Sequence, residues 1–180
     1  FCGIDILEGS CPSVINCILW GNSDSDISVS VSSDIQSAPQ VGAYTAPEGL
    51  ELEVVYSCIE RGFAGQGNIT EDPLFADLQN GDFSLTSVRG RYRLDGGGLQ
   101  NEGIRVLDDL MSPCIDAGSP YMRPGSEEMP NGGILNMGAF GGTRYASYSE
   151  WSIRGDLDAD GSAGFPDFQI MSSCWLISDK

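Results

Sequence analysis

Short β-branched stretches separated by turn residues fill the first half of the chain, and this pattern constrains the fold more than any other feature. The stretches are SVINCILWGNS (13–23), DISVSVSS (26–33), LELEVVYSCIE (50–60), GNIT (67–70), DPLFAD (72–77) and GDFSLTS (81–87). Each is too brief for a helix and is bounded by Gly, Asn, Asp or Ser, so we expect many short strands. With 180 residues, 41% of them hydrophobic and 19% charged, the chain is expected to fold as one domain with at most a small appendage.

Two of these stretches resemble each other. VINCILWGN and VVYSCIERG align so that Cys17 lies over Cys58 and Ile18 over Ile59, 41 positions apart in the sequence. Internal repetition of strand-like segments predicts stacked coils, in which like residues from successive coils form an interior ladder. The wide spacing requires an insertion between the coils, and SAPQVGAYTAPEG (37–49) has the composition of one.

An ordered series of motifs makes the expectation more specific. NCILWGNS, YSCIE, GNITEDPLFAD, NGDFSLTS, SPCIDAG and PNGGILNMGAFGGT occur in this order. The series resembles the C-terminal end of secreted right-handed parallel β-helix proteins of the pectate-lyase-like superfamily, in the form found in planctomycetes and related bacteria, where a dockerin-like tail follows. The resemblance covers most of residues 10–176 and implies an all-β fold, with terminal β-helix coils, an irregular Gly-rich cap and a small C-terminal EF-hand-like loop and helix.

This resemblance implies three regions and an extracellular location. Residues 1–113 would form the terminal coils, with loop insertions at 37–49 and 88–108; residues 114–150 would close the solenoid; residues 151–180 would form a dockerin-like calcium loop and helix. No capping segment precedes the first strand-like stretch. We therefore expect a piece of a longer bacterial protein that is secreted or displayed on the cell surface.

The stretch GDLDADGSAGFPDF (155–168) carries the clearest chemical signal. Numbered as a calcium loop, it places carboxylates at positions 1, 3, 5 and 12, a glycine at position 6 and a backbone carbonyl at position 7. Because Ca²⁺ takes six to eight oxygen ligands, this spacing predicts that the chain curls around one ion. The predicted ligands are Asp156, Asp158, Asp160, Ser162 and Asp167. The alternative is a solvated acidic turn that binds nothing.

The residues after the loop predict a helix. In FPDFQIMSSCWL the apolar side chains recur every three or four residues, which favours a helix from about Pro166 to Leu176. A proline is compatible with the first helical turn, where its missing N–H has no partner. The resemblance to dockerins implies a cohesin-like or cell-surface protein as partner, but loop positions 10 and 11 hold Phe165 and Pro166 where cohesin-binding dockerins commonly have small hydroxyl residues.

Charge and composition exclude several classes of function. The chain has 26 acidic and 9 basic residues, a net charge of −17 and no histidine. A protein this acidic lacks the clustered cations that bind nucleic acid or an anionic membrane surface, so cations are its natural partners. The absence of histidine excludes Ser-His and Cys-His catalysis and histidine-ligated metal sites. No run of 18 apolar residues is present to span a membrane.

The six cysteines leave two interpretations open. They are scattered along the chain with no Cys-x-x-Cys pair, which argues against zinc binding and redox catalysis. One or two extracellular disulfides are possible from the count, with Cys2 and Cys11 as the local candidate pair. The alternative, which we favour for Cys17 and Cys58, is that they are unpaired buried thiols acting as small hydrophobic residues.

We expect no catalytic residue in this chain. Polysaccharide lyases of the resembled superfamily bind Ca²⁺ through acidic residues and abstract a proton with Arg or Lys, and the counterparts here would be Glu60 and Arg61, with Glu71 and Asp72 nearby. Charged residues at strand ends are ordinarily solvated turn residues. The expected function is therefore a non-catalytic, calcium-binding cap and attachment module of a carbohydrate-active or cell-surface protein, with polysaccharide as a further partner.

Two alternatives to that function stay open. One is that the chain is part of a polysaccharide lyase or glycoside hydrolase acting on acidic polysaccharides, with its groove mainly upstream. The other is an adhesive or display protein without chemistry.

Overall fold

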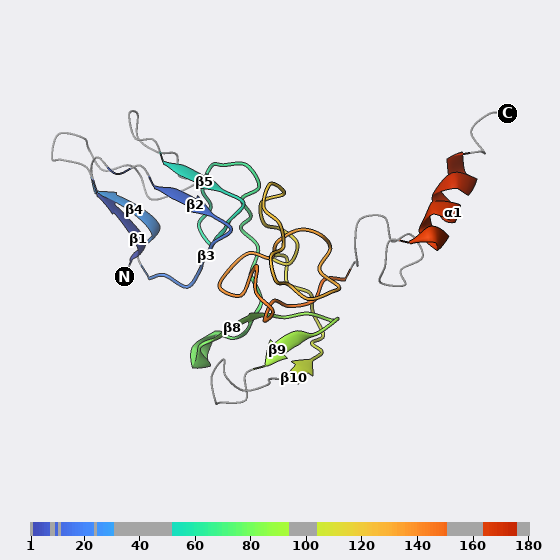
Figure 1. The fold of residues 1–180 in the computed structure, drawn as a ribbon. Helices are drawn as coiled ribbons and strands as arrows, with labels where there is room; N and C mark the ends of the chain where they lie inside the picture. Colours follow the sequence, from blue (N-terminus) through green and yellow to red (C-terminus); the bar gives the residue numbers. More distant parts are fainter. Residues whose placement is uncertain are drawn as a thin grey trace.

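The computed structural model describes residues 2–7, 10, 12–23, 25–30, 52–93, 104–150 and 164–175. Within them the chain forms short strands and one α-helix (Figure 1). The strands are β1 (Cys2–Leu7), β2 (Ser13–Ile15), β3 (Ile18–Leu19), β4 (Ser25–Ser30), β5 (Glu53–Val55), β6 (Cys58–Ile59), β7 (Phe75–Asp77), β8 (Asp82–Leu85), β9 (Arg91–Arg93) and β10 (Ile104–Val106). A 3₁₀ turn covers Leu78–Asn80, and α1 covers Phe165–Trp175.

The two similar stretches do pair in parallel, but in a different register from the predicted one. β2 pairs with β5 and β3 pairs with β6, with Ile18 opposite Cys58 and Leu19 opposite Ile59. The paired residues are 40 positions apart, so the alignment of Cys17 with Cys58 is wrong by one residue. A shift of one residue moves every side chain to the other face of a strand, so the two cysteines do not stack.

A left-handed corner in each repeat fixes this register. Asn16 lies between β2 and β3 with φ of 57°, and Tyr56 lies between β5 and β6 with φ of 49°. Non-glycine residues seldom adopt positive φ, except for asparagine, so two such corners at equivalent places show that the backbone turns alike in both copies. The corners align Asn16 with Tyr56, residues that sequence similarity does not match.

The prediction of an all-β right-handed parallel β-helix is wrong. The described residues form five separate two-stranded sheets and one helix, a small mixed α/β arrangement with no solenoid sheet. Beyond β6, Cys58 and Ile69 form an isolated parallel bridge. β7 and β8 then pair antiparallel, as do β9 and β10. The reason is that side chains and turns, rather than a further coil, take the backbone hydrogen bonds next to β5 and β6.

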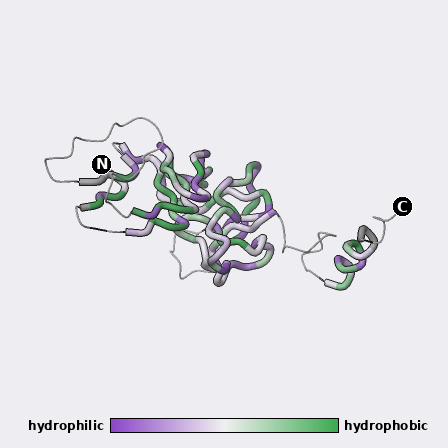
Figure 2. The backbone as a smooth tube through the Cα atoms, turned by 90° about the horizontal axis from the view of Figure 1, so that it is seen from above, coloured by the Kyte–Doolittle hydropathy of each residue, from purple (hydrophilic) through white to green (hydrophobic). Residues whose placement is uncertain are grey.

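The strands enclose two hydrophobic cores that meet at β6. The first core is built on Ile6, Val14, Ile27, Val54, Ile59 and Phe63; the second is built on Cys58, Leu85, Cys114, Ile115 and Met137. Consecutive residues of β6, Cys58 and Ile59, thus point into different cores, and neither is more than 1% exposed. β6 is buried on both faces, as a central parallel strand would be. Hydrophobic residues, green in Figure 2, gather along these strands.

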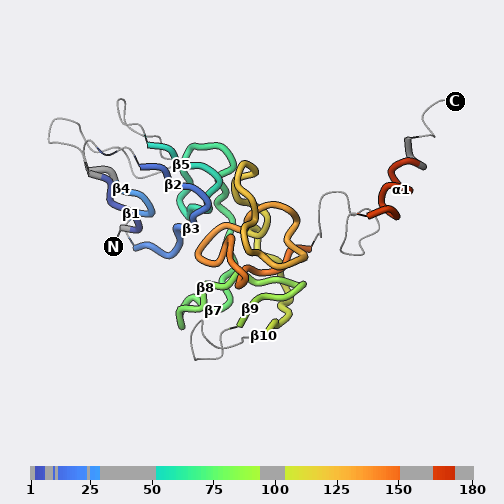
Figure 3. Tube along the Cα trace, in the orientation of Figure 1, coloured from blue at the N-terminus to red at the C-terminus, as the bar shows by residue number. Residues whose placement is uncertain are grey.

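Residues 107–150 cross the molecule as turns rather than strands. In Figure 3 this segment, yellow to orange, lies between the parallel pairs and the strands β8–β10. Two long-range hydrogen bonds fix it: the Gly138 nitrogen donates to the Asn16 carbonyl at 2.8 Å, and the Ser112 nitrogen donates to the Thr86 carbonyl at 3.0 Å. Within the stretch predicted as a loop insertion at 88–108, β9 and β10 form an antiparallel pair. The insertion predicted at 37–49 lies outside the described residues.

The predicted C-terminal helix is present, with bounds within one residue of the expected ones. α1 begins at Phe165 and ends at Trp175. Among the described residues, no helix has the length and apolar character needed to cross a membrane.

Candidate functional site

Only one of the five predicted calcium ligands lies in the described part of the chain. Asp156, Asp158, Asp160 and Ser162 fall outside it, and Asp167 lies in the first turn of α1. Elsewhere in that described part, no group of three or more His, Cys, Asp or Glu side chains is arranged to hold a metal ion.

Asp167 caps the helix that follows the acidic loop. Its side chain is 4% exposed, and its Oδ2 accepts a hydrogen bond from the Gly164 nitrogen at 2.5 Å. The Phe168 nitrogen in turn donates to the Gly164 carbonyl at 3.3 Å, the first hydrogen bond of α1. This is one half of a capping box, in which an acidic side chain in the third helical position satisfies the N–H that precedes the helix. The negative charge also suits the N-terminal end of the helix dipole.

A second group of acidic residues, absent from the sequence-based predictions, lies in residues 107–150, which we call the turn-rich segment. Asp116 and Glu127 come from different turns and are joined through Asn136. The backbone nitrogen of Asp116 donates to Asn136 Oδ1 at 2.9 Å, and the backbone nitrogen of Asn136 donates to Glu127 Oε1 at 2.9 Å. Ser149 Oγ donates to Asp116 Oδ2, and the Gly142 nitrogen donates to Glu127 Oε1. Within the part of the chain that the structure describes, one oxygen of each carboxyl, Asp116 Oδ1 and Glu127 Oε2, is buried and has no hydrogen-bond partner.

Burial raises the pKa of both carboxyl groups. Desolvation raises the pKa of Asp116 from 3.8 to about 6, against the opposing effect of the Ser149 hydrogen bond. Desolvation also raises the pKa of Glu127, and the nearby Asp116 charge adds to the increase, whereas the hydrogen bonds from Gly142 and Asn136 lower it. Burial therefore disfavours the charged form of both carboxyl groups in this segment.

The residues considered as lyase counterparts are engaged in local hydrogen bonds. Glu60 Oε2 accepts from the Gly21 nitrogen at 3.0 Å, and the Arg61 guanidinium donates to the carbonyls of Asn22 and Ser23. Asp26 Oδ2 accepts from the Arg61 nitrogen at 3.0 Å. Together these contacts hold the turn that follows β3 against the turn that follows β6.

Glu71 and Asp72 also contact the backbone beside them. Glu71 Oε2 accepts from the Thr70 nitrogen, and Asp72 Oδ1 accepts from the Leu74 nitrogen at 2.8 Å. The second contact is an Asx turn, which supports the positive φ of 52° at Leu74. These contacts do not bring the four charged residues together in one site. In this structure Glu60, Arg61, Glu71 and Asp72 stabilise turns.

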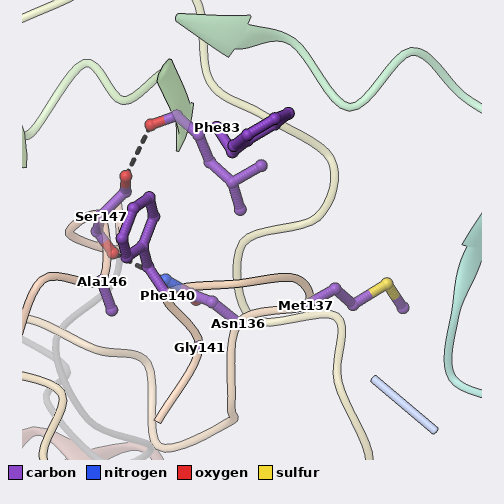
Figure 4. Close-up of a pocket in the computed structure, with 8 residues that line it drawn as sticks. Phe83, Asn136, Met137, Phe140, Gly141, Ala146 and Ser147 are labelled. Atoms are coloured by element: carbon purple, nitrogen blue, oxygen red, sulfur yellow. Dashed lines mark hydrogen bonds between the residues drawn. The ribbon is translucent and has the colours of Figure 1, made fainter. Parts of the chain in front are cut away.

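A small cavity lies beside the second core, where β8 meets the turn-rich segment (Figure 4). Its walls include Phe83, Phe140 and Met137, and the Asn136 amide crosses it to donate to the Ser147 carbonyl at 2.8 Å. The cavity volume of about 10 Å³ is about that of one water molecule. A sugar ring does not fit in it.

A weak signal of the Asp116 network is present in the sequence. Asp116 and Asn136 lie in the motifs SPCIDAG and ILNMGAFGG, which the sequence analysis interprets only as a closing segment. A carboxylate within an apolar, glycine-rich stretch is a sign of burial, but the sequence does not reveal that Glu127 would be its neighbour.

Comparison of the chain with models of protein families, with curated proteins and with solved structures found no match.

Proposed function

We propose that this chain is a calcium-binding attachment module, in which the acidic loop at 156–167 binds one Ca²⁺ and α1 presents a surface to a partner. The observation that carries the proposal is the junction of loop and helix. α1 begins at Phe165, within the predicted loop, and the last predicted ligand, Asp167, is nearly fully buried in its first turn.

The donor set fits calcium rather than a transition metal. The five predicted ligands, Asp156, Asp158, Asp160, Ser162 and Asp167, offer only oxygen atoms, and the chain has no histidine. Hard cations such as Ca²⁺ are bound by carboxylate and carbonyl oxygens, and softer metals select nitrogen and sulfur. A bound ion would offset the repulsion among the carboxylates and order the loop ahead of the helix.

Exposed apolar side chains on α1 support the attachment role. Phe165 is 72% exposed, Phe168 55% and Met171 45%. Large apolar side chains grouped on one short helix, in a chain of net charge −17, are costly to leave in water unless a partner covers them. We propose a protein or polysaccharide of the bacterial cell surface as the partner, and an extracellular location for the chain.

Calcium titration of the whole chain tests the metal site. Isothermal calorimetry in calcium-free buffer should show one ion per chain, with helix content by circular dichroism rising over the same calcium range as α1 is ordered. Asp158→Asn should weaken binding by at least tenfold, because it removes a predicted charged ligand. The matched variant Asp109→Asn removes one exposed carboxylate elsewhere and should bind as the wild type does. Equal affinity in both variants would exclude this loop as the site.

Co-sedimentation with purified bacterial cell-wall sacculi tests attachment. The chain should sediment with them in calcium and stay in solution in EGTA. Phe165→Ser should reduce sedimentation, and Leu107→Ser is a matched control because Leu107 is 73% exposed on a different part of the chain. Calcium binding without calcium-dependent sedimentation would support the metal site and refute this form of attachment.

A further inference from the structure

The second core contains two cysteines that approach each other from distant parts of the sequence. Cys58 comes from β6 and Cys114 from the turn at 113–116, and both are 0% exposed. Both pack in the same core with Leu85 and Met137. Both are free thiols in this structure, and the neighbouring Cys58 thiol helps to raise the pKa of Cys114.

Hydrogen bonds fix the backbone on both sides of this pair. The Cys58 nitrogen donates to the Cys17 carbonyl at 2.8 Å, and the Cys58 thiol donates to the Glu71 carbonyl at 3.3 Å. The Cys114 nitrogen donates to Ser112 Oγ at 3.1 Å, and the Cys114 carbonyl accepts from the Met137 nitrogen at 2.9 Å. Both cysteines are therefore held in the same core by strands and turns that are themselves anchored.

Cys17, a third free thiol, is a poorer partner for Cys58. It lies one position out of register with Cys58 across the parallel pair, and its side chain packs against the first core, whereas Cys58 points into the second. Since a disulfide requires side chains that point toward each other, Cys114 is the partner that the structure favours.

We propose that Cys58 and Cys114 form a disulfide when the chain folds in an oxidising compartment. In the oxidation, the thiolate of one cysteine attacks a low-molecular-weight disulfide such as glutathione disulfide, giving a mixed disulfide and releasing one glutathione thiolate. The thiolate of the other cysteine then attacks the protein sulfur of the mixed disulfide and releases the second glutathione. Two protein thiols become one disulfide, and one glutathione disulfide becomes two thiols.

Burial determines when this exchange occurs. The neighbouring Cys58 thiol and desolvation raise the pKa of Cys114, so the thiolate needed for attack is scarce in the folded protein. The disulfide therefore forms during folding or through transient opening, and once formed it is shielded from reductants. The bond would link β6 to the turn-rich segment and is independent of the calcium site.

Peptide mapping of the oxidised protein tests this proposal. The full chain is refolded in a glutathione redox buffer, acid-quenched, denatured, alkylated and digested. The expected result is a linked pair of peptides containing Cys58 and Cys114, absent after reduction. Recovery of both cysteines as alkylated thiols, or linked to other cysteines, would overturn the proposal.

Variants give a second readout. Reductant should lower the melting temperature of the wild type by about 5–15 °C, because the disulfide restricts the unfolded chain. Cys17→Ala should keep both the linked peptides and this shift. Cys58→Ala/Cys114→Ala should lose most of the shift; if it keeps the full shift, another disulfide is responsible and the proposed contribution to stability is refuted. Should the double variant fail to fold, the wild-type peptide map still decides whether the bond forms.

Discussion

The side-chain oxygen of Asn68 accepts a hydrogen bond from the backbone nitrogen of Ser57 at 3.0 Å, at the corner between β5 and β6. The Asn68 amide donates to the carbonyls of Val54 and Phe63 at 2.9 and 3.0 Å. The residue beside it, Ile69, forms a parallel bridge with Cys58 of β6. The Asn68 side chain thus satisfies three backbone groups and supports the Tyr56 corner.

Asn68→Ala should therefore destabilise the protein by about 2–4 kcal/mol, because it leaves backbone groups without partners in a part-buried corner. Urea unfolding followed by circular dichroism measures the change. Asn80→Ala is the control, since the Asn80 side chain contacts Asp77 at an exposed site and should cost about 0.5 kcal/mol or less. Similar losses in the two variants would show that the Asn68 contacts do not hold the corner.

Two adjacent glycines separate the effect of crowding from that of backbone conformation. Gly132 and Gly133 both have positive φ, 57° and 72°, but a Cβ at Gly132 would collide with the Asp116 carboxyl, whereas a Cβ at Gly133 meets nothing within 4 Å. Gly133→Ala should lower the free energy of unfolding by about 1–2 kcal/mol, because alanine is strained in the left-handed backbone conformation. Gly132→Ala should cost about 1–3 kcal/mol more, because it also displaces a buried carboxyl. Equal unfolding free energies would contradict the placement of Asp116 beside Gly132.

The raised pKa of Asp116 predicts how stability depends on pH. Because this pKa rises from 3.8 to about 6 on folding, the folded state holds the proton more tightly than the unfolded state. Its contribution to stability is full below about pH 4 and is lost as pH rises through about 6. Asp116→Asn removes this dependence while keeping the size of the side chain.

The measurement is the free energy of unfolding of both proteins from pH 4 to 7. The variant should gain about 1–3 kcal/mol relative to the wild type across this range. Acidic groups remote from Asp116 are present in both proteins, so their effects largely cancel in the difference, whereas removal of the Asp116 charge also lowers the pKa of Glu127. A constant difference across the range would mean that Asp116 titrates normally.

Arg105 joins β10 to the end of the turn-rich segment. Its guanidinium lies 3.9 Å from the centre of the Tyr148 ring and donates to the carbonyls of Ala146 and Arg144 at 2.6 and 3.0 Å. Arg105→Lys keeps the positive charge but loses the planar guanidinium, with its paired hydrogen bonds and its stacking on the Tyr148 ring. The free energy of unfolding, measured by thermal unfolding, should therefore fall by about 1–3 kcal/mol. Arg89→Lys, at an exposed position, should change stability by less than about 0.5 kcal/mol; an equally small change at Arg105 would argue against a role in packing.

Local structure is largely predictable from this sequence. The spacing of Phe165, Phe168 and Met171 predicts α1 within one residue at each end. Strands occur within five of the six predicted stretches, and in the sixth, GNIT, Ile69 makes only an isolated bridge. Turn residues and short apolar runs carry this information because they act over a few residues.

Long-range structure is less predictable, and two errors show why. Matching Cys17 to Cys58 follows side-chain identity, whereas the register follows the left-handed corners at Asn16 and Tyr56. Extending one parallel pair to a solenoid assumes further coils, but Ile69 makes only an isolated bridge with Cys58, and β7 and β8 pair antiparallel. The approach of Cys114 to Cys58 and of Glu127 to Asp116 depends on turns that bring distant segments together, for which the sequence carries no local signal.

Equilibrium dialysis of the whole chain against ⁴⁵Ca²⁺ tests the central claim most directly. The proposed site predicts saturation at one calcium ion per chain at or below millimolar free calcium, and a large loss of that binding in Asp158→Asn. Absence of bound calcium at millimolar concentration, or unchanged binding in the variant, would contradict the account.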